Sequence, residues 1–204
     1  MDLIVAACRV LANRPRLHLL QALQAKPAST VSDLALAVGL PLGVVSHQLK
    51  LLGQFHFVQA RPSGRYVRYR PANPAQVASP FLRNVLELVQ KNLADRNSTL
   101  REVWNSRAQQ KQDEELVKTF TTYTHLRRLL ILRQLATRGA YTPADLARLV
   151  GMSPPAACRH LAKLQRRGVA CFAGPPPHVW RLATQPGKSL QRNLLDIVSH
   201  ALKV

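Results

Sequence analysis

Apolar residues in the first half of the chain recur with the three-to-four-residue spacing of amphipathic helices. Leu17, Leu20 and Leu23, for example, fall on one face of a single helix. The same spacing predicts helices over residues 2–12, 16–24, 42–52 and 80–95. The chain is therefore expected to build a core from the apolar faces of successive helices.

A further short helix is predicted between the second and third of these segments. Thr30 marks its start, because a Thr hydroxyl caps a helix while an acid three residues later, here Asp33, reaches back to the capping residue. Gly39 marks its end, since glycine adopts the left-handed conformation that a tight turn requires. Helix, glycine turn and the helix over 42–52 together predict a helix-turn-helix.

Two β-prone segments follow the helix-turn-helix. Residues 57–61 and 65–70 flank the turn residues Pro62-Ser63-Gly64, which predicts a β-hairpin. A helix-turn-helix followed by a basic hairpin is a winged helix. The expected fold class is mostly α (α+β).

The chain repeats itself. Shifting the sequence by 112 residues aligns 16–52 with 128–164 without a gap, and thirteen of the 37 positions are identical, where chance gives roughly three. With a shift of 109, residues 83–89 match 192–198. Thr142, Asp145 and Gly151 repeat the helix signals of the first copy at the same offset of 112. The sequence therefore predicts tandem winged helix-turn-helix repeats, with a first unit over 1–96, a helical linker over 97–112 and a second unit over 113–204.

Composition and charge narrow the choice of function. The 204 residues include 29 Lys and Arg against 10 Asp and Glu, a formal charge of +19, and both halves are basic. Phosphate backbones are the commonest partner of such a surface, which predicts binding to double-stranded DNA. No apolar run approaches the roughly 18 residues of a membrane span, so no membrane partner is expected. Three cysteines favour a reducing, cytoplasmic compartment.

The residues also resemble a known family, the ArsR/SmtB family of bacterial winged-helix repressors. In the first unit the resemblance covers the whole length and rests on residues 11–17, Asp33-Leu34-Ala35, Val45-Ser46-His47-Gln48-Leu49-Lys50 and Gly64-Arg65-Tyr66-Val67-Arg68-Tyr69. The second unit is more diverged and is similar through Asp145-Leu146-Ala147 and residues 160–164.

The resemblance implies a transcriptional regulator, expected to be a repressor at the bacterial nucleoid. Family members usually act as homodimers that read a two-fold symmetric operator. Two units in one chain then imply an intramolecular pseudo-dimer that reads an imperfect palindrome, and whether the chain dimerises again stays open. Its central layer is expected from helices near 2–12, 80–95, 114–124 and 188–202. Two separate modules on a flexible tether are the alternative.

Candidate DNA contacts follow from the predicted recognition helices and wing. The resemblance assigns this role to Ser46 and His47, and the matching position of His47 in the second unit is Arg159. Arginine suits a guanine edge or a phosphate, and each candidate also fits a solvated surface charge. The candidate contacts are Ser46, His47, Lys50, Arg61, Arg65, Arg68, Arg159, His160, Lys163, Arg166 and Arg167, with Arg127 and Arg128 as further phosphate contacts.

Two departures from the family keep other functions open. The recognition helices open with Pro41-Leu42-Gly43-Val44 and with residues 153–157, which are poor in base-reading side chains, and the second wing, 174–178, has no Arg or Lys. These features also suit an architectural protein that coats DNA with little sequence preference. They equally suit a winged-helix protein-interaction module, because fold does not fix function.

No sensor or active site is predicted. The family's metal-binding Cys-x-Cys pair corresponds to Thr30 and Ser32, and hydroxyls do not replace thiolates for soft metals. Asp196 and His200 are four residues apart, but Lys91 stands at one matching position of the first unit and is a poor ligand. The acids of residues 113–115 are expected at a helix start, where they complement the helix dipole. We expect no cofactor, no metal and no enzymatic activity.

Overall fold

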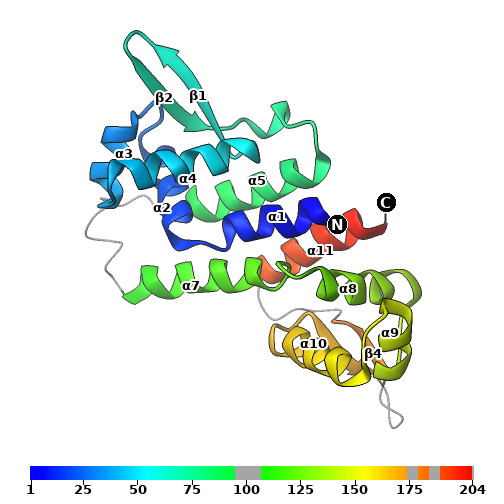
Figure 1. The fold of residues 1–204 in the computed structure, drawn as a ribbon. Helices are drawn as coiled ribbons and strands as arrows, with labels where there is room; N and C mark the ends of the chain where they lie inside the picture. The colour runs from blue at the N-terminus through cyan, green and yellow to red at the C-terminus, as the bar shows by residue number, and fades with distance from the viewer. Residues whose placement is uncertain (95–106, 174–178, 184–188, 204) are drawn as a thin grey trace. The chain divides into compact units, whose positions relative to one another are not determined.

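The chain folds as two compact units (Figure 1). The computed structural model describes residues 1–94, 107–173, 179–183 and 189–203. We call residues Arg9–Lys118 the N-unit, and Met1–Cys8 together with Thr119–Val204 the C-unit. Part of the predicted linker and the tip of the second wing lie outside the described residues, and the domain boundaries stay a prediction.

The N-unit holds the predicted helices and hairpin in their expected order. After the last residues of α1 (Asp2–Leu11) it contains α2 (Arg14–Ala25), α3 (Val31–Val38), α4 (Leu42–Gln54), β1 (Val58–Ser63), β2 (Tyr66–Pro71), the short 3-10 turn η1 (Pro74–Gln76), α5 (Pro80–Ala94) and α7 (Arg107–Thr121) as far as Lys118.

The predicted cap at the start of α3 and the predicted glycine turn between α3 and α4 are both confirmed. The Thr30 hydroxyl accepts a hydrogen bond from the Asp33 backbone N–H at 3.2 Å, and the Asp33 carboxylate accepts one from the Thr30 N–H at 2.8 Å. This capping box satisfies two of the N–H groups that a helix start leaves free. Gly39 ends α3 with a φ of 68°, in the left-handed region.

The wing of the N-unit is a two-stranded antiparallel hairpin. It projects from the helices in Figure 1, and β1 packs against α4. Gly64, with a φ of 60°, lies in the turn that joins the strands. Ser29, just before the cap of α3, exchanges two backbone hydrogen bonds with Tyr69 of β2. The wing is therefore tied to the start of the helix-turn-helix.

The core of the N-unit includes one fully buried acid. Asp113 lies in the interior of α7, and its carboxylate accepts hydrogen bonds from the Gln109 amide at 2.8 Å and from Arg14 at 3.4 Å. His18 Nε2 lies 2.8 Å from the same carboxylate. The expectation that residues 113–115 start a helix was wrong, because α7 already extends from Arg107. Asp113 instead joins α7 to α2.

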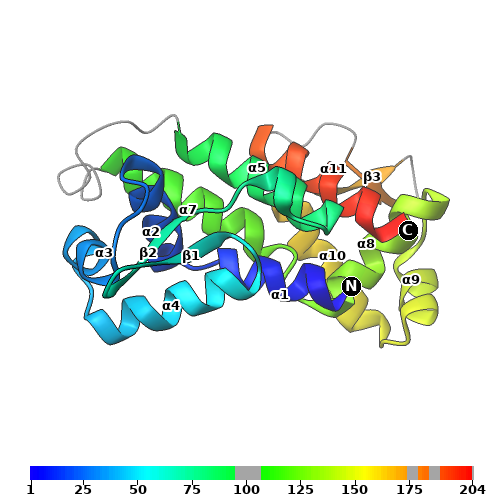
Figure 2. The same ribbon diagram turned by 90° about the horizontal axis from the view of Figure 1, so that it is seen from above.

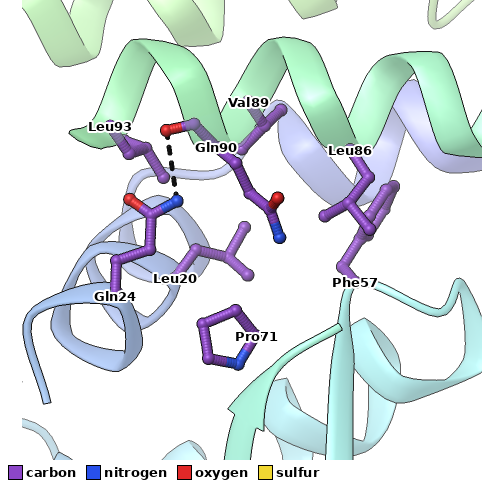
Figure 3. Close-up of a pocket in the computed structure, with 8 residues that line it drawn as sticks. All are labelled: Leu20, Gln24, Phe57, Pro71, Leu86, Val89, Gln90 and Leu93. Carbon is purple, nitrogen blue, oxygen red and sulfur yellow. Dashed lines mark hydrogen bonds between the residues drawn. The ribbon is translucent and has the colours of Figure 1, made fainter. Parts of the chain in front are cut away.

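A small cavity lies between α2, the hairpin and α5 (Figure 3). Gln24 donates from its side-chain amide to the Gln90 carbonyl at 3.2 Å, and Gln90 donates to the Ala72 carbonyl at 2.8 Å. The cavity measures about 10 Å³, which is room for one water molecule. It is too small for an organic effector. Its walls are Leu20, Gln24, Phe57, Pro71, Leu86, Val89, Gln90 and Leu93.

The C-unit contains elements in the same order. It has α8 (Leu126–Arg138), α9 (Pro143–Val150), α10 (Pro154–Arg166), β3 (Ala170–Ala173), β4 (Val179–Leu182) and α11 (Ser189–Lys203). Thr142 caps α9 by accepting from the Asp145 N–H at 3.2 Å, and Gly151 ends it with a φ of 65°.

Backbone hydrogen bonds of the two units recur 112 residues apart. Phe57 N–H donates to the Leu52 carbonyl at the end of α4, and Val169 N–H donates to the Leu164 carbonyl at the end of α10. The bridge between Ser29 and the second strand of its hairpin likewise recurs at Tyr141. The two helix-turn-helix segments therefore enter their hairpins through the same local geometry.

The first residues of the chain contribute to the core of the C-unit. Tyr123 is fully buried there, and its hydroxyl accepts a hydrogen bond from the Gln191 amide at 2.7 Å. Burial raises the pKa of Tyr123 well above its usual value, and the nearby Cys8 adds to the shift. Cys8 is itself buried, and this burial raises its thiol pKa to about 12, so it behaves as a small apolar residue.

In the part of the chain that the structure describes, no single helix is long and apolar enough to cross a membrane. The pair α3 and α4 passes such a test by length and composition alone, and the two helices are bent by 108°.

Candidate nucleic-acid interface

Helix α4 presents a polar face to solvent and an apolar face to the core. Val45 and Leu49 are buried against the N-unit. The three predicted contacts of this helix, Ser46, His47 and Lys50, are all exposed. Figure 2 shows α4 running along the N-unit beside the hairpin. The side chains expected to contact bases and phosphates are therefore accessible, as recognition requires.

Helix α10 carries a row of cations on its exposed face. Arg159, Lys163 and Arg166 are exposed and follow one another at spacings of four and three residues, which places them on one face of the helix. Leu161 and Leu164 fill the opposite, buried face. The C-unit thus gathers on one helix the positive charge that would contact DNA phosphates.

Both candidate recognition helices lack a side-chain cap at their first turn. Pro41 precedes α4 and has no hydrogen-bonding side chain, and Ser153 precedes α10 without making a cap hydrogen bond. Helices α3 and α9 by contrast are capped by the side chains of Thr30 and Thr142, which directly precede them. The first N–H groups of α4 are thus left without a side-chain acceptor, whereas α10 begins with Pro154 and Pro155, which have no N–H to satisfy.

The wing of the N-unit is strongly basic. Arg61, Arg65 and Arg68 are all exposed. Arg61 and Arg68 are directly opposite each other in the strand register, and like charges in that position destabilise a hairpin. Arg68 also donates to the Ala28 carbonyl at 3.0 Å. A cost of this kind is typical of a surface whose ligand supplies the missing negative charge.

His160 and Arg167 are more enclosed than the other candidates. The His160 ring packs against the ring of His125 with centroids 4.8 Å apart. Partial burial lowers the pKa of His160, and His125, Arg128, Arg127 and Lys163 lower it further by their charge. One terminal nitrogen of Arg167 is buried without a hydrogen-bond partner. His160 therefore sits in a positive field, where an anion would stabilise its protonated form.

Arg128 does not belong to this surface. The expectation that it contacts phosphate was wrong, because the side chain is buried and donates to the Thr121 carbonyl at 3.0 Å. Its neighbour Arg127 is exposed in the first turn of α8.

Arg16, which matches Arg128 in the sequence alignment, has the same structural role in the N-unit. It donates to the carbonyls of Val10 and Arg9 and to the Gln48 amide oxygen, the last at 2.7 Å. Both arginines fasten the end of the preceding helix, which sequence reasoning missed. The identity of the two positions was the signal available.

At the positions that match the family's metal sites, the structure shows a helix cap and two exposed side chains. The Thr30 hydroxyl serves as the cap of α3. Asp196 and His200 are both exposed on α11. Among the described residues, no three His, Cys, Asp or Glu side chains gather as a metal site would require.

The fold and the exposed cations define a winged helix-turn-helix protein with the surface of a nucleic-acid binder. Comparison with known families gives the class its name: residues 125–170, from His125 before α8 to the first residue of β3, match the sequence model of the bacterial regulatory protein, arsR family. The chain thus carries an ArsR-type helix-turn-helix, the DNA-binding domain of a transcriptional regulator. No curated protein and no solved structure matches the chain.

The family match falls in the C-unit. This is the copy that the sequence predicted to be the more diverged one, and the resemblance of residues 11–69 to the same family stays a prediction. The individual contact residues also stay predictions, since the match identifies the domain and not the role of each side chain.

Proposed function

We propose that this protein is a transcriptional repressor that grips double-stranded DNA as a pseudo-symmetric clamp, with α4 and α10 in successive major grooves about 34 Å apart. In this proposal the two units are tandem copies of one winged helix in one chain. The protein would act at the bacterial nucleoid in the cytoplasm and repress by occluding a promoter.

The observation that carries the proposal is the matched exposure of two recognition faces. His47 on α4 and Arg159 on α10 occupy equivalent positions, and both are exposed. Each face also carries an exposed lysine, Lys50 on α4 and Lys163 on α10. The net charge of +19 supports a polyanionic partner for both faces.

The chain path supports the pseudo-dimer. The N-unit takes in α7 as far as Lys118, and the C-unit takes in Met1–Cys8. In the N-unit, Asp113 holds α7 against α2 through its contacts with His18 and Arg14. A helix that precedes one winged helix in the sequence is thus a core element of the other, which is the arrangement expected when first helices form a dimer interface.

The first test is selection of bound fragments from the source genome at near-physiological salt with excess competitor DNA. Recovery of a few sites that share an imperfect palindrome is the expected result. The double variant Arg65→Ala/Arg159→Ala should bind these sites more weakly, while Arg192→Ala, an exposed cation on α11, should bind as the parent does. Unchanged affinity in the double variant would show that the groove assignment is wrong.

An architectural role is the second candidate, favoured by the openings of the recognition helices. Pro154 and Pro155 occupy the first turn of α10 and are exposed, and neither has a side-chain donor for a base edge. Such a protein would keep a steep salt dependence: the slope of log affinity against log salt would be about −0.9 for each phosphate neutralised. Its affinity for a preferred site would be only slightly higher than its affinity for other DNA. Recovery of unselected fragments in the genomic selection would favour it over the repressor.

A further inference from the structure

The first turn of α4 exposes apolar side chains that the N-unit does not bury. Leu42 is 54% exposed and Val44 is 41% exposed, whereas Val45 between that turn and the next is fully buried. In a helix-turn-helix, the N-terminal residues of the recognition helix contact base edges. These two side chains therefore stand where bases are read.

Gly43 separates the two apolar residues, and the fold does not require a glycine there. A Cβ built on Gly43 meets nothing within 4 Å. Gly43 is the second residue of α4, and alanine is a better helix former than glycine. A glycine without an internal reason is typical of a close approach between backbone and ligand.

Gly43 also lies on the reading face of the helix. His47 follows it by four residues and Lys50 by seven, so the three positions share one face. Leu42 and Val44 flank Gly43 on either side. The turn thus presents an apolar edge with His47 and Lys50 behind it, and the exposed Arg61, Arg65 and Arg68 of the same unit's wing add positive charge.

We propose that the first turn of α4 reads thymine, with Leu42 and Val44 in contact with 5-methyl groups in the major groove and Gly43 allowing the backbone to approach. The inference rests on the proposed DNA-binding function and names the chemistry of one half-site. Among the groups that base pairs display in the major groove, the thymine methyl is the apolar one. The cations around the turn favour DNA over an apolar protein surface as its occupant.

The first turn of α10 in the C-unit does not expose a matching pair of apolar side chains. The residues that match Leu42 and Val44 are Pro154 and Ala156, and Ala156 is buried. Arg159 is instead the exposed candidate for a guanine edge on α10. The two halves of the operator should therefore differ in kind, with thymines under α4 and a guanine under α10.

The test replaces thymine by deoxyuridine, one position at a time, in the tightest duplex recovered from the genomic selection. This change removes a methyl group and leaves base pairing intact. At one or two neighbouring thymines of a single half-site we expect affinity to fall about fourfold each, the equivalent of one methylene's burial. With Leu42→Ala/Val44→Ala the same substitutions should cost less than about twofold, because the methyl has lost its partner.

Two further variants serve as a control and as a test of the backbone approach at Gly43. Leu36→Ala removes a 76% exposed apolar side chain from α3 and should retain the full methyl dependence. Gly43→Ala should raise the thermal unfolding temperature and yet weaken DNA binding at least about tenfold, because the added Cβ favours the helix but separates backbone from base.

The outcomes separate this inference from the proposed function. DNA binding that is intact but insensitive to every deoxyuridine substitution overturns the reading of thymine and leaves the repressor standing. Parent-like DNA binding by Leu42→Ala/Val44→Ala overturns it as well, in favour of an apolar surface for a protein. A parent chain that binds no duplex at low salt overturns the proposed function itself.

Discussion

Arg61 and Arg68 lie directly opposite each other across the β1–β2 hairpin, with no acidic residue in either strand. The hairpin therefore carries two like charges at one cross-strand position, in an arrangement that lowers its own stability. We expect a bound polyanion to relieve this repulsion, because its phosphates would supply the negative charge that the strands lack.

Arg61→Thr should separate these two effects. Threonine suits a strand and removes the repulsion, so the free energy of unfolding should rise by about 0.5 kcal/mol. DNA affinity should fall, and the slope of log affinity against log salt should become shallower by about 0.9. Thermal unfolding and binding titrations at several salt concentrations measure both. Lys91→Ala, which removes an exposed cation from α5, is the control and should leave the slope unchanged.

The ends of the two recognition helices give a second prediction. His56 after α4 has a φ of 56°, and the equivalent Gly168 after α10 has a φ of 67°. A side chain with a Cβ is strained there and glycine is not. His56→Gly should therefore raise the free energy of unfolding by up to about 1 kcal/mol, and Gly168→Ala should lower it by about 1 kcal/mol or more. Chemical denaturation measures both, and a loss of stability in His56→Gly would contradict the prediction.

Helix starts and helix ends are the part of the fold that the sequence predicts well. Thr30 with Asp33 signals a helix start and Gly39 a helix end, because each acts through residues three or four positions away. Arg128 shows the limit of such local prediction. In a chain with a charge of +19, any one arginine is expected at the surface, whereas the burial of Arg128 depends on the Thr121 carbonyl, which comes close only in the folded unit.

Contacts between residues far apart in the sequence could not be predicted either. Asp113 meets His18 across 95 positions of sequence, and no local pattern announces that contact. The exposed face of α10 was predictable, since helical spacing alone places Arg159, Lys163 and Arg166 together. Helical spacing does not separate a base contact from a phosphate contact, and Arg159 is the candidate base contact because the internal repeat aligns it with His47.

Removing the buried carboxylate of α7 should destabilise the N-unit. Asp113→Ala leaves His18 and Arg14 without their shared partner, and we expect a loss of about 3 kcal/mol in the free energy of unfolding. Asp113→Asn keeps an acceptor oxygen and should lose less. Glu114→Ala changes the exposed neighbour on the same helix and serves as control. A change within about 0.5 kcal/mol in Asp113→Ala, as at an ordinary surface site, would contradict this assignment.

The capping box of α3 should make stability depend on pH in the acid range. Hydrogen bonds from Thr30 lower the pKa of Asp33 from its usual 3.8 to about 2. A lowered folded pKa means that the stabilisation is complete above about pH 4 and is lost as pH falls toward 2. Asp33→Asn should therefore unfold at lower temperature than the parent at pH 7, and the difference should shrink at pH 2. An equal difference at both pH values would contradict the role of the carboxylate.

DNA affinity should rise as pH falls below about 7, through His160. In the free protein, partial burial and the positive charges of His125, Arg128, Arg127 and Lys163 lower its pKa below the usual 6.5. Phosphates near α10 would oppose that field and raise the pKa, so binding takes up a proton and is favoured by acid.

His160→Gln tests this linkage. It should flatten the increase in affinity between about pH 7 and pH 5.5, the range in which histidine titrates. His200→Gln, on the exposed face of α11, is the matched control and should keep the parent's pH profile. Binding titrations in buffers of equal ionic strength measure it. A profile that is the same in the parent and in His160→Gln would show that DNA does not come close to this histidine, and would exclude the C-terminal part of α10 from the interface.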